Sequence, residues 1–127
     1  MDDMRKPYSK KSIDPLFQKE NYGVIKNAQG YGKFTGSCGK VMEIYLKIKE
    51  NKICDAKFVT DGSEATFSCG NTVTSLSIGR QLQDVMSITS QDILNNLGGL
   101  PARNEHCSVL AENAVKQALR NYLGMMY

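Results

Sequence analysis

Apolar and polar residues alternate along the middle of the chain, where the hydrophobic pattern has a period of two. Between residues 41 and 49 every second side chain is apolar, at Met42, Ile44, Leu46 and Ile48. This alternation is typical of a half-buried strand. After a turn at 50–52, residues 53–60 are predicted as the next strand, with one face formed by Cys54, Ala56 and Phe58. Because the turn is short, the two strands are expected to form an antiparallel hairpin.

Later in the chain the hydrophobic period becomes that of a helix. Apolar residues recur three and four positions apart between 106 and 122, at Val109, Leu110, Ala114, Val115, Ala118 and Leu119. This spacing predicts a long helix with one buried face. Shorter helices are expected over 65–78, 80–88 and 91–97.

The ends of the shorter helices carry recognisable stop and start signals. Gly79 is expected to close the first in a left-handed conformation, and Ser90 is expected to cap the third at its N-terminus. Gly98 and Gly99 end the third helix. Residues 100–104 are then expected to be an extended connector that leads to the long helix.

A leading helix is expected over residues 8–19, with an apolar side formed by Tyr8, Ile13, Leu16 and Phe17. Because proline breaks a hydrogen bond in a helix interior, Pro15 places its start at Ser12 or Asp14. Residues 1–7 are expected to be flexible. With a brief edge strand over 31–35, these elements predict one α+β domain spanning 1–127. A small antiparallel three-stranded sheet would pack against a layer of helices.

Composition and charge narrow the class of protein. The 127 residues are enough for one ordinary core, and no apolar run approaches the length of a membrane span. The charged first residues lack the apolar segment of a signal peptide, so a cytoplasmic protein without a membrane partner is expected. A net charge of +3 is too small to indicate nucleic-acid binding. Lysine and arginine crowd the chain before residue 58, which suits an acidic partner protein or, more simply, a solvated basic surface.

The single histidine and one of the four cysteines stand together at the predicted start of the long helix. Widely spaced cysteines in a reducing compartment indicate ligands, nucleophiles or core residues rather than disulfides. Backbone N–H groups and the helix dipole favour a thiolate there, so the pKa of Cys107 is expected to be lowered. The alternative is a buried Cys107 beside a capping His106, and this stretch alone leaves both open. Cys54 is expected to be a small core residue of the sheet.

Candidate ligands occur at three junctions between a loop and the element that follows, at residues 36–40, 61–64 and 105–107. Loops held by a rigid frame commonly carry function, and metal sites are often assembled from distant segments. Gly36 and Gly39, near Cys38, would let the backbone pass close to a bound metal or a partner's loop. The three junctions therefore predict a common site.

Four motifs give the sequence a specific likeness. They are Cys38-Gly39 followed by Val41-Met42, the strand Asp55-Ala56-Lys57-Phe58 leading to Thr60-Asp61-Gly62, Leu97-Gly98-Gly99-Leu100-Pro101, and His106-Cys107-Ser108-Val109-Leu110-Ala111-Glu112. From Tyr8 to Tyr122 the chain resembles the U-type iron-sulfur cluster scaffold family, which comprises the IscU proteins and the N-terminal domain of NifU. The resemblance implies the IscU/NifU-like fold. It also implies a nascent cluster built on three cysteines and an aspartate, with sulfur handed over as persulfide by a cysteine desulfurase.

Within this resemblance, Cys38 matches the first family cysteine, Cys107 the third, and His106 the family histidine. Two of the family's ligand positions differ here. Lys40 stands where the family has its aspartate, and Ser63 stands where it has its second cysteine. A serine hydroxyl is a poor ligand for an iron-sulfur cluster, and an ammonium group repels a metal cation.

Other residues near the altered positions offer alternatives. Cys38, His106 and Cys107 suffice for zinc if water, Ser63, Glu64 or Asp61 supplies a fourth donor. Glu64 stands where the family has glycine. Cys69 lies inside the predicted helix and does not simply replace the missing cysteine. Lys40 would instead lower the pKa of Cys38 or Cys107 and favour attack on a persulfide.

Two functions stay open for such a sequence. The first is a scaffold that accepts sulfur on Cys107 from a cysteine desulfurase, binds iron or a transient iron-sulfur cluster, and serves apo iron-sulfur recipient proteins. The alternative is a degenerate member that binds zinc, or that docks on a desulfurase as a modulator or persulfide relay. No group is arranged to turn over a small substrate, so an enzyme is not expected. The family's chaperone-binding stretch is reduced to Leu100-Pro101, so delivery by an Hsp70-type chaperone is not expected.

Overall fold

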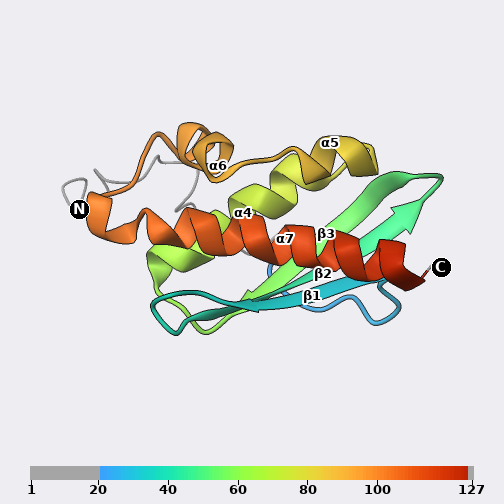
Figure 1. Ribbon diagram of the computed structural model, residues 1–127, viewed down its shortest axis with the longest axis horizontal. Helices are drawn as coiled ribbons and strands as arrows, with labels where there is room; N and C mark the ends of the chain where they lie inside the picture. Colours follow the sequence, from blue (N-terminus) through green and yellow to red (C-terminus); the bar gives the residue numbers. More distant parts are fainter. Residues whose placement is uncertain (1–20, 126–127) are drawn as a thin grey trace.

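The computed structural model describes residues 21–125, and the predicted leading helix over 8–19 lies outside them. Its three strands form an antiparallel sheet in the order β1-β2-β3, over Gly30–Thr35, Val41–Lys49 and Lys52–Thr60. Helices α4 (Glu64–Ser77) and α7 (His106–Met125) cover one face of the sheet, and α5 (Leu82–Met86) and α6 (Ser90–Leu97) lie over these two helices (Figure 1). The predicted α+β class, with helices layered on a three-stranded antiparallel sheet, is confirmed.

Strand β2 follows its predicted alternation, because Met42, Ile44, Leu46 and Ile48 are all buried. The register of β2 against β3 then changes: Leu46 pairs with Ala56, whereas Ile48 pairs with Ile53. This β-bulge adds one residue to β3, so Ile53 and Ala56 both face the core while Cys54 is exposed. The prediction that Cys54 is a core residue is wrong, because simple alternation does not account for a bulge.

The helices agree with the sequence pattern except at their ends and at Val109, which was predicted on the buried face of the long helix but is 47% exposed. Helix α7 continues to Met125, three residues beyond the predicted end. Gly79 has a positive φ of 89°, but the cap of α4 is the extended Ile78, and the Gly79 N–H donates to Ile53 O at 2.7 Å. The connector is not extended either. Ala102–Asn104 form a short 3-10 turn, in which Asn104 N–H donates to Pro101 O at 2.8 Å.

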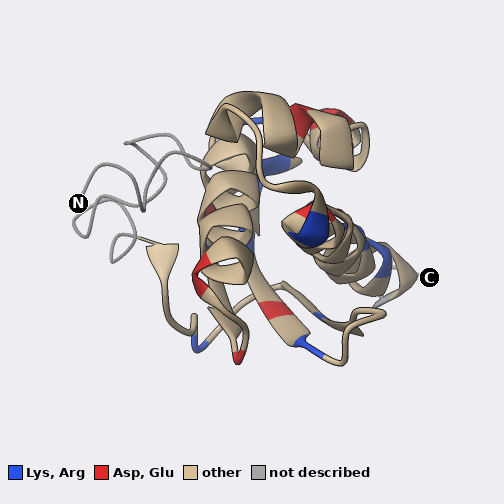
Figure 2. Cartoon of the chain, turned by 90° about the vertical axis from the view of Figure 1, so that its left-hand side faces the viewer, with Lys and Arg blue, Asp and Glu red and all other residues tan. Residues whose placement is uncertain are grey.

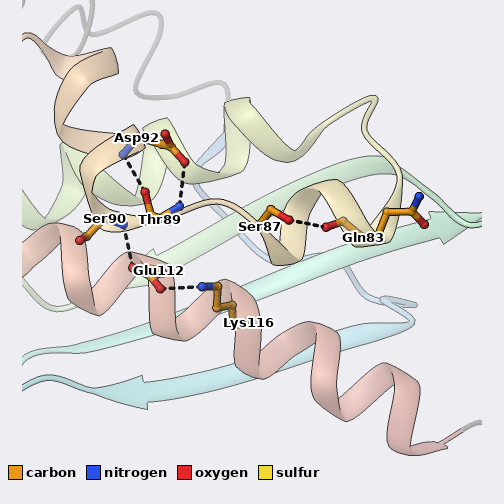
Figure 3. Close-up of polar contacts among 7 residues, drawn as sticks. All are labelled: Gln83, Ser87, Thr89, Ser90, Asp92, Glu112 and Lys116. Atoms are coloured by element: carbon orange, nitrogen blue, oxygen red, sulfur yellow. Dashed lines mark hydrogen bonds and ion pairs between the residues drawn. The ribbon is translucent and has the colours of Figure 1, made fainter.

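Helix α6 is capped by Thr89 and not by Ser90, so this prediction is wrong by one residue. Thr89 Oγ1 accepts the Asp92 N–H at 3.2 Å, and the Asp92 carboxylate accepts the Thr89 N–H at 2.9 Å, which forms a capping box. The Ser90 N–H instead donates to Glu112 of α7 at 2.7 Å, and Glu112 also pairs with Lys116 at 2.6 Å (Figure 3). A carboxylate of α7 therefore fixes the start of α6.

Helix α7 approaches strand β1 closely because β1 presents glycine to it. A Cβ atom at Gly32 would lie 2.3 Å from the backbone N of Ala118, which is far inside van der Waals contact. Asn121 Nδ2 adds a hydrogen bond to Tyr31 O at 2.7 Å. These contacts set the height of α7 above the sheet, and α7 carries the His106-Cys107 pair at its start. None of the helices within residues 21–125 is both long and apolar enough to cross a membrane.

Candidate functional site

Cys38 lies in the turn that joins β1 to β2. Gly39 N–H donates to Gly36 O at 3.0 Å, and Gly36 N–H donates to Lys40 O at 2.8 Å, so two backbone hydrogen bonds close the turn. Gly39 has a φ of +88°, which side chains other than glycine rarely adopt. The turn itself therefore requires the glycine after Cys38. Cys38 and Lys40 are both exposed there.

The segment between β3 and α4 is tied to the start of β2, directly after the Cys38 turn. Val41 N–H donates to Asp61 Oδ1 at 2.9 Å, and Thr60 Oγ1 donates to Val41 O at 2.6 Å. Ser63 follows as the N-cap residue of α4, but its side chain makes no capping hydrogen bond. The first two predicted junctions thus meet at one end of the sheet, at the left of Figure 1.

The start of α7 brings the third junction to the same end. Cys107 Sγ lies 3.3 Å from Thr66 Oγ1 and 3.8 Å from His106 Nε2. Thr66 Oγ1 in turn lies 3.5 Å from Ser63 Oγ. A row of polar atoms thus runs from an imidazole through a sulfur to two hydroxyls. Figure 2 views the molecule from this end, where both acidic and basic residues occur.

Burial governs the acidity of the Cys107 thiol. Its side chain is 2% exposed, and this desolvation raises the pKa of Cys107; the hydrogen bond with Thr66 opposes the increase, and the charge of Cys38 adds to it. The expectation that the helix start lowers this pKa is wrong, because burial removes the water that would stabilise a thiolate. Lys40 is not among the groups that shift it. Cys38 is thus close enough to Cys107 for its charge to disfavour the Cys107 thiolate.

Cys69 lies in the core on α4, one turn after Thr66. It is fully buried, and burial strongly raises its pKa, to which the nearby Cys107 adds. Such a thiol stays protonated at neutral pH and is shielded from solvent. Cys69 therefore does not offer a ready thiolate in place of the one that Ser63 lacks.

The oxygen donors of the predicted site lie at its rim. Asp61 and Glu64 are exposed, and one oxygen of Asp61 already accepts the Val41 N–H. Glu64 and Ser63 line an open hollow of about 200 Å³ together with Gly62 and Phe67. Within residues 21–125 no three His, Cys, Asp or Glu side chains are arranged to hold a metal ion together. The ligand set of Cys38, His106 and Cys107 therefore stays a prediction.

Thr66 is the polar neighbour of Cys107 that the sequence analysis missed. It lies three positions after Ser63, on a helix that was predicted from about residue 65. That spacing places two side chains on the same helix face, so a hydroxyl at 66 beside Ser63 was predictable. Its contact with Cys107 was not, because it depends on how α4 and α7 pack.

Comparison with known proteins places this geometry in context. The family described as NifU-like N terminal domain matches residues 7–126. The chain is 36% identical over 116 residues to the iron-sulfur cluster assembly scaffold protein IscU 1 of Archaeoglobus fulgidus, covering 91% of this chain and 76% of the relative. It is 29% identical to the nitrogen fixation protein NifU of Trichormus azollae, covering 93% of this chain but 42% of that longer relative.

The solved structures agree on the fold. A nitrogen-fixing NifU-like protein (N-terminal) from Brucella abortus matches with a TM-score of 0.65, covering 95% of this chain and 97% of that one. The sequences are only 15% identical, so this likeness concerns the fold alone. The sheet and its helix layer are thus found in a protein whose sequence has diverged widely from this one.

Proposed function

Because the chain belongs to the NifU-like N-terminal domain family, we propose that it is a scaffold protein of iron-sulfur cluster assembly. The observation that carries the proposal is the meeting of three chain segments at one end of the sheet. There the Cys107 sulfur lies 3.3 Å from Thr66 Oγ1, and Cys38 is close enough for its charge to raise the pKa of Cys107. Two thiols and an imidazole at one loop-rich end offer donors for iron and sulfur, and within residues 21–125 they are not arranged in advance to hold a metal ion together.

Cys107 is the proposed sulfur acceptor, and its donor is a cysteine desulfurase that carries a persulfide. The Cys107 thiolate attacks the outer sulfur of that persulfide; a new S–S bond forms, and the donor cysteine leaves as a thiolate. Because burial raises the pKa of Cys107, its proton must be removed first. His106 Nε2, 3.8 Å from the sulfur, is suitably placed to take it.

Cys38 and His106 are the proposed further donors to iron, and apo iron-sulfur proteins are the proposed recipients of the cluster. The cluster is cargo and not a resident cofactor in this scheme. Cysteine thiolates are the usual ligands of such clusters, so the serine at position 63 leaves the set one thiolate short. Lys40, exposed in the Cys38 turn, would attract anionic sulfur species to the site.

Anaerobic reconstitution with iron, sulfide and a thiol tests the proposal. We expect a coloured product with sulfur-to-iron charge-transfer absorption in the wild type, and its loss in Cys38→Ala and Cys107→Ala. Cys54→Ala is the matched control, because Cys54 is equally a cysteine of this chain but is exposed on β3 at the bulge. A colourless wild-type product, or equal loss of colour in Cys54→Ala, would refute cluster binding at this site.

The second candidate is a degenerate member that binds zinc or docks on a desulfurase without building a cluster. The replacements at Lys40 and Ser63 favour it, because they remove a carboxylate and a thiolate from the family ligand set. Metal analysis of anaerobically purified protein distinguishes the two candidates. Bound zinc, or affinity for a desulfurase with no cluster formed, supports this second function, whereas iron and acid-labile sulfide in the protein count against it.

A further inference from the structure

The hydroxyl of Thr66 is buried at the contact between α4 and α7. Thr66 is 1% exposed and Cys107 is 2% exposed, and their side-chain oxygen and sulfur lie 3.3 Å apart. On its other side the Thr66 oxygen lies 3.5 Å from the hydroxyl of Ser63, an exposed residue. A buried sulfur is therefore linked by one buried hydroxyl to one hydroxyl at the surface.

We propose that Thr66 is a positioning residue for Cys107, whose hydroxyl holds the sulfur at the start of α7 against the first turn of α4, with Ser63 supporting that hydroxyl from the solvent side. The hydrogen bond itself stands apart from the proposed function. Its consequence for a bound cluster rests on that function.

The local sequence allows the Thr66 side chain this position. A Cβ atom at Gly62 would lie 2.5 Å from the Thr66 Cβ and 2.6 Å from its Oγ1, so glycine at 62 makes the space that the threonine occupies. Threonine is branched at Cβ and has few rotamers, so its oxygen is held in place. Ser63 is free to face Thr66 because its side chain makes no cap to the backbone of α4.

A hydroxyl serves the sulfur in both of the states that a scaffold needs. When Cys107 is a thiol, its S–H would donate to Thr66 Oγ1, which leaves the Thr66 O–H to donate to Ser63 Oγ. When the sulfur is deprotonated, or coordinates iron, the Thr66 O–H would donate to it, and Ser63 would donate to Thr66. The donor and acceptor roles along these hydrogen bonds would reverse, while the oxygen and sulfur atoms keep their positions.

This arrangement has a consequence for a cluster bound through Cys107. A hydrogen bond to a coordinating sulfur withdraws charge from it and stabilises the reduced cluster, which raises the reduction potential. Thr66 would then partly offset burial, which disfavours a charged sulfur at the same position.

Infrared spectroscopy of the metal-free protein tests the hydrogen bond directly. The S–H stretching band of Cys107 is assigned from the difference spectrum with Cys107→Ser. We expect Thr66→Val, which keeps the shape and removes the hydroxyl, to move this band to higher wavenumber. Thr66→Ser should restore it. The matched control is Thr74→Val on the same helix, because Thr74 is buried but donates to Gly70 O at 2.8 Å and not to a sulfur.

A Cys107 band that does not move in Thr66→Val, or that moves equally in Thr74→Val, overturns the proposal. The protein reconstituted with iron and sulfide supplies the second measurement. Thr66→Val should shift the reduction potential to more negative values and Thr66→Ser should not, and equal potentials in all three proteins would count against the role in tuning. Failure of the wild type to take up a cluster would count against the proposed function alone, because the infrared result decides the hydrogen bond without it.

Discussion

Replacing Gly32 with alanine tests how α7 is held above the sheet. The added Cβ would lie 2.3 Å from Ala118 N, 2.8 Å from Ala118 Cα and 2.8 Å from the Gln117 carbonyl carbon. All three are backbone atoms of α7, so no side-chain rotation relieves the contact. Ordinary contact needs about 3.4–4 Å. The helix must therefore move away from β1 by about an ångström, or the strand must distort.

Such overpacking typically costs about 1–3 kcal/mol. With a urea m value of about 1–3 kcal/mol/M, the unfolding midpoint of Gly32→Ala should fall by roughly 1 M at an unchanged m. Gly36→Ala is the matched control on the adjoining turn, because the three atoms nearest to its Cβ would be Leu110 side-chain atoms at ordinary contact distance, the closest at 3.6 Å. That variant should have an unchanged stability, or should be more stable by up to about 1 kcal/mol, because alanine reduces the conformational entropy of the unfolded chain. Equal midpoints for the two variants would refute the close approach of α7 to β1.

Three further measurements test the helix cap and the burial of the thiols. In urea unfolding, Thr89→Ala should lower the free energy of unfolding by about 1 kcal/mol, and Ser90→Ala should lower it much less. The reverse order would indicate that Ser90 is the cap. The Thr89 backbone N–H donates to the Asp92 carboxylate and holds its pKa below the ordinary 3.8. The contribution of Asp92 to folding stability is therefore complete above about pH 3.8 and is lost as the pH falls through the folded-state pKa. An acid-unfolding curve for Asp92→Asn that parallels the wild type would contradict this. Brief alkylation of the native protein, followed by mass spectrometry, should modify the exposed Cys38 and Cys54 before the buried Cys69 and Cys107.

The sequence predicted most of the frame because local pattern and final packing agree there. The alternation at Met42–Ile48 describes a face that is buried in the structure, and so does the helical period from residue 106, except at Val109, which is 47% exposed. The pattern failed where contacts between elements, and not the local sequence, determine which residues are buried or act as caps. Cys54 is exposed because a bulge changes the strand register, and Ser90 loses the cap because its N–H finds Glu112 on another helix.

The candidate site divides along the same line. Its residues were predictable, because ligand-type side chains stand at three loop junctions. The junctions meet because the β1–β2 turn, the end of β3 and the start of α7 lie at the same end of the sheet. The acidity of Cys107 was not predictable from its position at a helix start. That argument assumes a solvated thiol, whereas α4 packs over it and leaves 2% of the side chain exposed. Only the packed helix pair reveals that desolvation dominates.

The altered positions at Lys40 and Ser63 stand in different surroundings. Lys40 is exposed in the Cys38 turn and is not among the groups that shift the pKa of Cys107. Ser63 reaches the buried sulfur only through Thr66. Restoring a thiolate with Ser63→Cys would add a ligand at the rim but would leave the Thr66–Cys107 contact in place. The proposed attraction of anionic sulfur by Lys40 and the proposed positioning of Cys107 by Thr66 can thus be tested by separate substitutions.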